Sequence, residues 1–208
     1  NFLKLFMRSK KKYSYNKWIG ECREIKKSLQ IDNLNYKKEF KSHVNPYKFI
    51  KDLSKILDKK AIIIPDDGGH LTWTMQAYEL KKGQRLFSAF GNSPMGYCIP
   101  ASIGAKLASP KSDVVCIEGD GSFQINPQEL HTIIENDLNI KIFIMNNDGY
   151  GIIRQFQKLY LENRLEASKK GISNPNFKDI AKAFRFKYFK INNDYETKNK
   201  LKNIFKSK

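Results

Sequence analysis

The 208-residue sequence has few cysteines and no long apolar run. Its three cysteines, Cys22, Cys98 and Cys116, are scattered and form no Cys-x-x-Cys pair, which predicts packing roles in a reducing compartment and not a disulfide framework. The three histidines lack the spacing of zinc ligands. No apolar stretch approaches the ~20 residues that span a bilayer, and no segment resembles a signal peptide. These absences predict a cytoplasmic protein without a membrane span.

Acidic residues are also scarce, with 21 against 38 basic ones and a net charge of +17. The basic excess lies in residues 1–60 and 153–208, whereas residues 61–152 hold 6 basic and 10 acidic side chains. A nucleic-acid-binding protein would concentrate its basic residues at the binding surface. Because the motifs described below lie in the acidic segment, we interpret the lysines as solvated surface and do not expect nucleic acid as a partner.

Two polar, glycine-containing turns follow two apolar segments. Residues 119–123, Gly-Asp-Gly-Ser-Phe, follow a predicted strand at 114–117. Residues 146–151, Asn-Asn-Asp-Gly-Tyr-Gly, follow a predicted strand at 140–145. A helix is expected between them, with Asn126 as its N-cap and a glutamate three residues later. In such a β-α-β unit both turns lie at the carboxyl edge of a parallel sheet, where ligands bind.

These turns carry oxygen ligands that suit magnesium. Asp120 offers a carboxylate, Asn147 a side-chain amide oxygen and Gly149 a backbone carbonyl. Mg²⁺ takes such oxygens in octahedral geometry and leaves positions for phosphate oxygens and water. Backbone N–H groups of the glycine turns and of the following helix suit a diphosphate. The sequence has neither a P-loop motif nor a Gly-x-Gly-x-x-Gly motif, so the pattern predicts a magnesium-diphosphate site of another kind.

The pair of turns resembles the cofactor motif of thiamine-diphosphate enzymes. Residues 90–105 resemble the stretch that holds the aminopyrimidine in the acetolactate synthase branch of that family, and residues 152–164 resemble its mobile active-site segment. The resemblance extends from about Trp18 to the carboxyl terminus. It implies an α/β domain whose mostly parallel sheet is flanked by helices on both faces, the thiamine-diphosphate-binding fold.

The resemblance also implies which residues bind the cofactor. The expected cofactor-binding residues are His70, Ser93, Met95, Gly119, Asp120, Gly121, Ser122, Asn147, Gly149, Tyr150, Gly151 and Ile152, and the expected magnesium ligands are Asp120, Asn147 and Gly149. The Ser93 carbonyl and the Met95 N–H would bind the pyrimidine, and the Met95 side chain would wedge between the two cofactor rings. His70 would donate to a phosphate oxygen or cap a helix, and both interpretations stay open. Ser122 is expected to face the diphosphate.

The sequence departs from the family pattern near the expected substrate. Gly69 stands where the family often has glutamine, and Ser93 and Pro94 replace the usual glycine and threonine. Phe156 replaces a tryptophan that the family links to the choice of the second keto acid; it keeps an aromatic wall but lacks the indole N–H donor. These departures leave the substrate and the product undetermined.

The remaining segments give a provisional division into domains. Helices are expected at 13–29, after Asn45-Pro46, at 99–108, from 151, at 178–184 and at 195–208, and further strands at 61–64 and 186–191. Trp18 is expected to be a packing anchor, and Asp66 and Asp67 a turn that faces solvent. We therefore assign residues 1–44 to the end of a preceding domain and a linker. Residues 45–208 form a cofactor-binding domain that lacks a final strand of the family.

The resemblance implies part of a lyase or transferase that acts on a 2-oxo acid. The family's activating glutamate lies on a pyrimidine-binding domain that 208 residues cannot include, so we name no catalytic residue. We expect that domain from the same or another chain, in a homo-oligomer, and expect the isolated chain to be inactive. A non-catalytic cofactor-binding module, another thiamine-diphosphate-dependent 2-oxo acid decarboxylase and a basic binding protein on a degenerate enzyme fold remain alternatives. The sequence does not decide whether FAD is bound.

Overall fold

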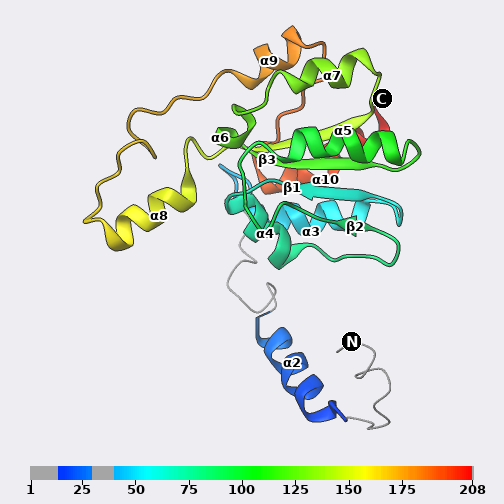
Figure 1. Cartoon of the computed structure of the whole chain (residues 1–208), viewed down its shortest axis with the longest axis vertical. Helices are drawn as coiled ribbons and strands as arrows, with labels where there is room; N and C mark the ends of the chain where they lie inside the picture. The colour runs from blue at the N-terminus through cyan, green and yellow to red at the C-terminus, as the bar shows by residue number, and fades with distance from the viewer. Residues whose placement is uncertain (1–13, 30–39, 208) are drawn as a thin grey trace, which may run out of the picture. The chain divides into compact units, whose positions relative to one another are not determined.

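A computed structural model describes residues 14–29 and 40–207 (Figure 1). The chain divides into two compact units, Asn1–Lys37 and Lys38–Lys208. The described part of the first unit holds the helix α2 (Asn16–Ser28), which has no buried residue. Trp18 on this helix is 64% exposed, so the expectation that it anchors packing is wrong for this chain. The predicted linker at 30–44 lies mostly outside the described residues.

The second unit is built on a four-stranded sheet of order β2-β1-β3-β4. The strands are β1 (Ile62–Pro65), β2 (Arg85–Leu86), β3 (Val114–Gly119) and β4 (Ile140–Met145). All three neighbouring pairs are parallel. Every residue of β1 and β3 is buried, as expected for central strands of a parallel sheet covered on both faces. The predicted α/β class and the strands predicted at 61–64, 114–117 and 140–145 are confirmed.

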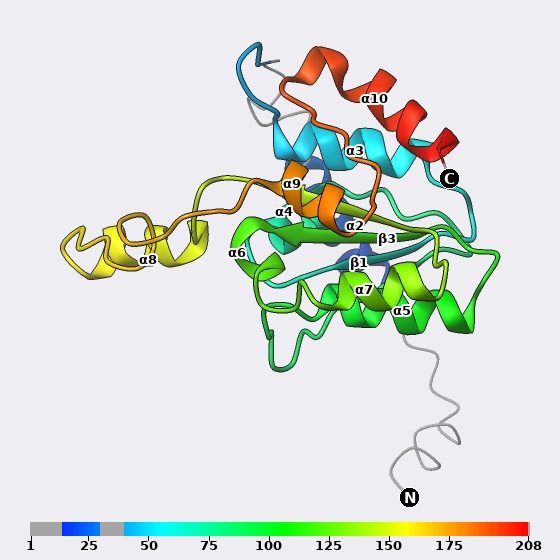
Figure 2. The same ribbon diagram turned by 90° about the horizontal axis from the view of Figure 1, so that it is seen from above.

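Helices cover both faces of this sheet. Figure 2 shows α3 (Pro46–Ile56) and α10 (Asp194–Lys206) on one side of β1 and β3, and α5 (Cys98–Ala108) and α7 (Glu129–Glu135) on the other. The helix α4 (Gly69–Ala77) packs against α3. The core beneath α5 and α7 includes Ile62, Ile64, Ile99, Val114, Leu130 and Ile133. Among the described helices, none is long and apolar enough to cross a membrane.

Local capping signals fix the start of α3 as predicted. The Asn45 side chain accepts hydrogen bonds from the N–H groups of Tyr47 and Lys48. The Asp194 carboxylate at the start of α10 accepts from the backbone N–H groups of Phe40 and Asn45, at 2.8 Å each. The beginnings of these two helices are therefore joined across about 150 positions of sequence, which holds α10 against the outer face of α3.

The predicted N-cap at Asn126 is wrong. A four-residue helix, α6 (Asp120–Phe123), directly follows β3, and α7 begins only at Glu129 without a side-chain cap. The Asn126 side-chain amide instead donates to the Gly96 carbonyl at 2.8 Å. A contact with a residue 30 positions away thus replaces the local hydrogen bond that the sequence pattern favours.

The predicted strand at 186–191 is also wrong. The helix α9 (Phe177–Ala183) is capped by the Asn176 side chain, which accepts a hydrogen bond from the Lys178 N–H. After α9 the chain continues to α10 without strand pairing. The backbone N–H of Phe186 bonds back to the Ala181 carbonyl. Tyr188 and Phe189 are both about two-fifths exposed, so this aromatic segment is not a buried strand. In the described chain, β4 is therefore the last strand of the sheet.

The cysteines differ from expectation as well. Cys98, the first residue of α5, and Cys116 in β3 form a disulfide, with Cα atoms 5.8 Å apart. Both residues are completely buried, whereas Cys22 is a free, exposed thiol. The pairing depends on the packing of α5 on β3, which brings together residues that sequence spacing does not mark as partners.

Candidate functional site

The two glycine-containing turns lie next to each other at the carboxyl edge of the sheet. Gly119 ends β3 and Met145 ends β4, and these two residues are paired in the register of the strands. Asp120 and Asn146 therefore leave the sheet side by side. This confirms that the topology brings the two turns together, as the β-α-β pattern predicts.

Asp120 is the hydrogen-bonding centre of this edge. Its side chain is only 3% exposed. One carboxylate oxygen, Oδ2, accepts from the N–H groups of Asn147 and Gly149 at 3.1 Å each, and Oδ1 accepts from the N–H of Gly121 at 2.9 Å. The N–H groups of the two glycine turns were expected to bind a diphosphate. Three of them instead donate to Asp120 and stabilise its negative charge.

Asn174 was not predicted to take part in this site, yet the structure places its side chain there. Its Nδ2 donates to Asp120 Oδ2 at 2.8 Å, to Asn146 Oδ1 at 3.0 Å and to Asp148 Oδ1 at 3.4 Å. Three hard oxygens thus converge on one point, which is the donor set that Mg²⁺ prefers. The site therefore fits a magnesium ion. Asn174 comes from the segment before α9, so only the tertiary fold could reveal it.

Asn147 and Gly149 are close to Asp120 through their backbone N–H groups. The Asn147 side chain is exposed, and its Nδ2 would lie 3.0 Å from a Cβ added at Gly151. Gly149 adopts a φ of +137°, and its N–H is buried against Asp120. The magnesium set Asp120, Asn147 and Gly149 remains a prediction, because it needs the Asn147 amide oxygen and the Gly149 carbonyl.

Close packing around Gly119 and Gly121 gathers three other predicted residues. A Cβ added at Gly119 would lie 2.8 Å from the His70 ring and 3.3 Å from Ser122 Oγ. A Cβ at Gly121 would lie 2.2 Å from the Tyr150 ring. A side chain at Gly119 would have to displace the His70 ring, and one at Gly121 the Tyr150 ring. His70, Ser122 and Tyr150 pack directly against the turn that carries Asp120.

His70 lies in the first turn of α4 and is buried. Burial lowers the pKa of its ring to about 4, although the negative charges of Asp66 and Asp120 oppose this shift. The residue that precedes α4 as its N-cap is Gly68, and no side chain caps the helix, so the capping role is not observed. Among the described residues, His70 Nε2 has no hydrogen-bond partner. An orphaned buried nitrogen beside Gly119 fits a site for a bound anion.

Asp66 does not face solvent, contrary to expectation. It is fully buried, and its carboxylate accepts from the N–H groups of Gly96 and Cys98 at 2.7 and 2.9 Å. Asp67 is half-buried; burial and the neighbouring charge of Asp66 raise its pKa. The Ser122 hydroxyl donates to the Asp67 carbonyl at 3.3 Å, which joins the turns after β1 and β3.

Asp66 thereby anchors the loop that holds Ser93 and Met95. Ser93 is exposed and adopts a φ of 45°, and Met95 is half-buried. The loop is fixed one residue later, since Gly96 donates its N–H to Asp66 and accepts the side-chain amide of Asn126. The structure thus ties the predicted pyrimidine-binding loop both to β1 and to the segment after α6.

Glu118 is a buried carboxyl group that the sequence did not single out. It lies in β3 against the disulfide, with Oε2 3.7 Å from Cys116 Sγ. Burial, and then the charge of Asp66, raises its pKa to about 10, so Glu118 is protonated at neutral pH. In the described chain, Cys98, Cys116 and Glu118 form the group whose ligand atoms lie close enough for a metal. Because the two sulfurs are bonded to each other, they offer no thiolates.

We expect the pH dependence of stability to report this protonated glutamate. The folded chain keeps a proton on Glu118 that the unfolded chain releases above pH 4.5. Stability therefore falls as pH rises toward 10, by about 1.4 kcal/mol per pH unit. Glu118→Gln should remove this slope and stabilise the chain by roughly 3 kcal/mol at pH 7. Urea unfolding at several pH values, with EDTA present, would measure both effects.

The informative window for this experiment is pH 7–9. Folding lowers the pKa of His70 from its ordinary value of 6.5 to about 4. The contribution of His70 to stability is therefore complete above pH 6.5 and is lost as pH falls toward 4. Glu135→Gln, at an exposed position of α7, is the matched control and should keep the wild-type slope. Equal slopes for wild type and Glu118→Gln would contradict a protonated Glu118.

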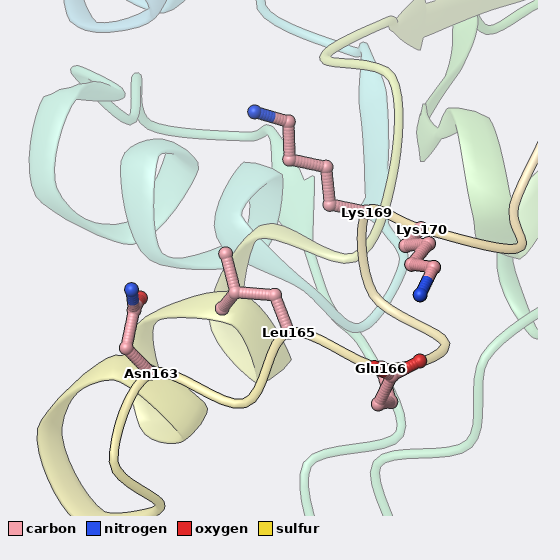
Figure 3. Close-up of a pocket in the computed structure, with 5 residues that line it drawn as sticks. All are labelled: Asn163, Leu165, Glu166, Lys169 and Lys170. Carbon is pink, nitrogen blue, oxygen red and sulfur yellow. The ribbon is translucent and has the colours of Figure 1, made fainter.

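The other predicted residues lie on a helix that extends away from the sheet. Tyr150 precedes α8 (Gly151–Tyr160), which carries Ile152 and Phe156, 46% and 54% exposed. Figures 1 and 2 show α8 and the segment after it reaching beyond the sheet edge. A hollow of about 450 Å³ in that segment is lined by Asn163, Leu165, Glu166, Lys169 and Lys170. Figure 3 shows these five side chains. None of these lining residues is a predicted cofactor residue.

Comparison with known proteins supports the same interpretation. Residues 66–208 match the family described as "Thiamine pyrophosphate enzyme, C-terminal TPP binding domain". The chain is 37% identical over 159 residues to the acetolactate synthase large subunit of Cyanidium caldarium, covering 76% of this chain and 27% of that protein. It is 33% identical over 202 residues to that of Lactococcus lactis, covering 97% and 34%. The chain thus spans about a third or less of the length of these relatives.

Proposed function

Because this chain belongs to the thiamine pyrophosphate enzyme family through its C-terminal TPP binding domain, we propose that it is the magnesium- and diphosphate-binding part of a longer enzyme acting on a 2-oxo acid. The named relatives are acetolactate synthases, which favours a carboligase or decarboxylase of that kind. The observation that carries the proposal is the buried Asp120 carboxylate at the carboxyl edge of the sheet, with the backbone of Asn147 and Gly149 against its Oδ2.

In the proposed site each residue has a definite part. The Asp120 carboxylate, the Asn147 amide oxygen and the Gly149 carbonyl would hold magnesium. His70 and Ser122 would face the diphosphate, together with the turn at Gly119 and Gly121. Burial keeps His70 neutral, and a nearby diphosphate would favour its protonated ring, which could then donate from Nε2.

The loop at Ser93 and Met95 would hold the pyrimidine, and Tyr150, Gly151 and Ile152 would flank the cofactor. Asp66 positions that loop through Gly96 and Cys98. When bound, thiamine diphosphate supplies the carbanion chemistry needed to cleave the bond next to a keto group. The activating glutamate would come from a pyrimidine-binding domain in the same or another chain, within a homo-oligomer. A cytoplasmic location is part of this proposal.

Calorimetry on the purified 208-residue chain tests the proposal. Thiamine diphosphate should bind weakly with Mg²⁺ and not with EDTA, because part of the binding surface lies on another domain. Asp120→Asn should weaken Mg²⁺-dependent binding by about a hundredfold or more, since even outer residues of metal sites contribute ~10–100-fold. Asp113→Asn, at the exposed opposite end of β3, is the control and should bind like wild type.

The same chain should not release CO₂ from pyruvate or another 2-oxo acid. Turnover near ~1–10 s⁻¹, the ordinary range of complete enzymes, would show that the chain needs no further domain. Cofactor binding that neither EDTA nor Asp120→Asn weakens would overturn the proposed magnesium-diphosphate site. The non-catalytic module is distinguished by adding the missing pyrimidine-binding domain, which should create activity only if this chain is part of an enzyme.

A further inference from the structure

We infer that Asn174 controls cation binding at Asp120, by occupying the carboxylate oxygen that a cation needs. This inference rests on the proposed function, which places magnesium on Asp120. The contact is the 2.8 Å hydrogen bond from Asn174 Nδ2 to Asp120 Oδ2. It comes from the segment before α9, 54 positions further along the chain.

Asp120 already accepts four hydrogen bonds through its carboxylate oxygens. A carboxylate has about four lone-pair positions, two on each oxygen. Oδ2 accepts from the N–H groups of Asn147 and Gly149 and from the Asn174 amide, so its two positions are fully used, whereas Oδ1 accepts only from the N–H of Gly121. Oδ2 is the oxygen that faces Asn147 and Gly149, the other two proposed magnesium ligands. One of the three donors must leave before a cation can bind there.

Of the three donors to Oδ2, the Asn174 amide is the one that can leave. The two backbone N–H groups are fixed by the turn, because the next residue, Tyr150, donates its own N–H to the Ser168 carbonyl at 3.2 Å. The Asn174 amide is the end of a side chain and can move by rotation. A hollow of about 230 Å³, lined by Asp148 and residues 172–174, lies beside it and leaves room for another side-chain position.

The Asn174 amide lies among several oxygens. Nδ2 also donates to Asn146 Oδ1 and Asp148 Oδ1, so an electropositive group lies where three oxygens converge. A cation at that point replaces the same attraction with a stronger one. Cation binding and the Asn174 hydrogen bonds therefore compete for Asp120 Oδ2, the oxygen that both use.

Gln124 holds the amide in place. Its Nε2 donates to Asn174 Oδ1 at 3.1 Å and to the Asp120 carbonyl at 3.3 Å. Asn174 also lies two residues before Asn176, the N-cap of α9. Release of the amide would thus free the start of α9 from the turn after β3. Cation binding and the placement of residues 172–176 are therefore coupled.

The test measures Mn²⁺ binding to the full chain by electron paramagnetic resonance, without thiamine diphosphate. Asn174→Ala should bind Mn²⁺ about tenfold more tightly than wild type, the factor expected for loss of one competing charge-assisted hydrogen bond. Gln124→Ala leaves the amide present but less restrained and should bind roughly threefold more tightly. Asn203→Ala, at an exposed position of α10, is the matched control and should not change affinity.

A second readout follows the segment itself. Amide hydrogen exchange in residues 172–176 of the wild type should be faster in saturating Mg²⁺ than in metal-free buffer, because the cation releases Asn174. Weaker or unchanged Mn²⁺ binding by both Asn174→Ala and Gln124→Ala would overturn the inference. Weaker binding would mean that Asn174 helps to hold the cation, as a positioning residue or a ligand. Circular dichroism identifies a variant that fails to fold, in which case the other variant decides.

Asp120→Asn distinguishes failure of the proposed magnesium site from failure of the role inferred for Asn174. If this variant binds Mn²⁺ like wild type, the cation is not on Asp120, and the proposed function and this inference both fail. If it loses binding while Asn174→Ala and Gln124→Ala bind like wild type, the magnesium site stands and only the role of Asn174 is wrong.

Discussion

Replacing Asp66 by alanine is expected to lower the free energy of unfolding by about 4 kcal/mol. The substitution leaves the N–H groups of Gly96 and Cys98 buried without their carboxylate acceptor. Each unsatisfied buried donor costs roughly 1–3 kcal/mol, and more when its partner was charged.

Urea unfolding monitored by circular dichroism would measure this change. Asp67→Ala is the matched control, since Asp67 is the next residue and only half-buried, and it should cost less than about 1 kcal/mol. Asp66→Asn keeps one acceptor oxygen and should fall between the two. If Asp66→Ala were no more harmful than Asp67→Ala, Asp66 would not hold the loop at Ser93 and Met95.

The second large effect is expected from Gly149→Ala, which should destabilise the chain by about 4 kcal/mol. The new Cβ would lie 2.4 Å from the Ser168 carbonyl oxygen, a backbone atom that cannot rotate away. The φ of +137° adds strain, because side-chain-bearing residues rarely adopt it. The turn must then shift and loses the hydrogen bond from Gly149 to Asp120.

Two other glycines separate crowding from backbone strain. Gly171→Ala has a φ of +78° but no atom within 4 Å of the new Cβ, so it should cost only about 1 kcal/mol. Gly104→Ala lies inside α5 with open space and should stabilise the chain by roughly 0.5–1 kcal/mol. Urea unfolding of the three variants should give this order, and Mn²⁺ binding should be lost only in Gly149→Ala. Similar costs for Gly149→Ala and Gly171→Ala would show that the Ser168 contact is unimportant.

Features that depend on nearby residues could be predicted from the sequence. The apolar strands β3 and β4 were found from short apolar runs, and the start of α3 from Asn45-Pro46 before an apolar periodicity. The adjacency of the two glycine turns followed from the parallel β-α-β connection alone. In each case the determining interaction lies within a few residues or is imposed by the connection.

Features that depend on distant partners could not be predicted. Asn126 has the sequence signature of an N-cap but bonds to Gly96, and Asp66 has that of a solvent-facing turn but holds buried amides. Asn174 reaches Asp120 across 54 positions. The high pKa of Glu118 arises from burial and from Asp66, which directly follows the neighbouring strand β1. These arrangements follow from packing, which periodicity and spacing do not encode.

The disulfide between Cys98 and Cys116 has a consequence for the denatured ensemble. It closes a covalent ring that contains α5 and the return to β3, and denaturant does not open this ring. The chain segment around Met95 and the segment around Asp120 therefore stay neighbours even when all helices and strands have melted. For these two segments, the conformational search is confined to the volume that the ring allows. The turn after β4 lies outside the ring, so the disulfide does not restrict its conformations in the denatured chain.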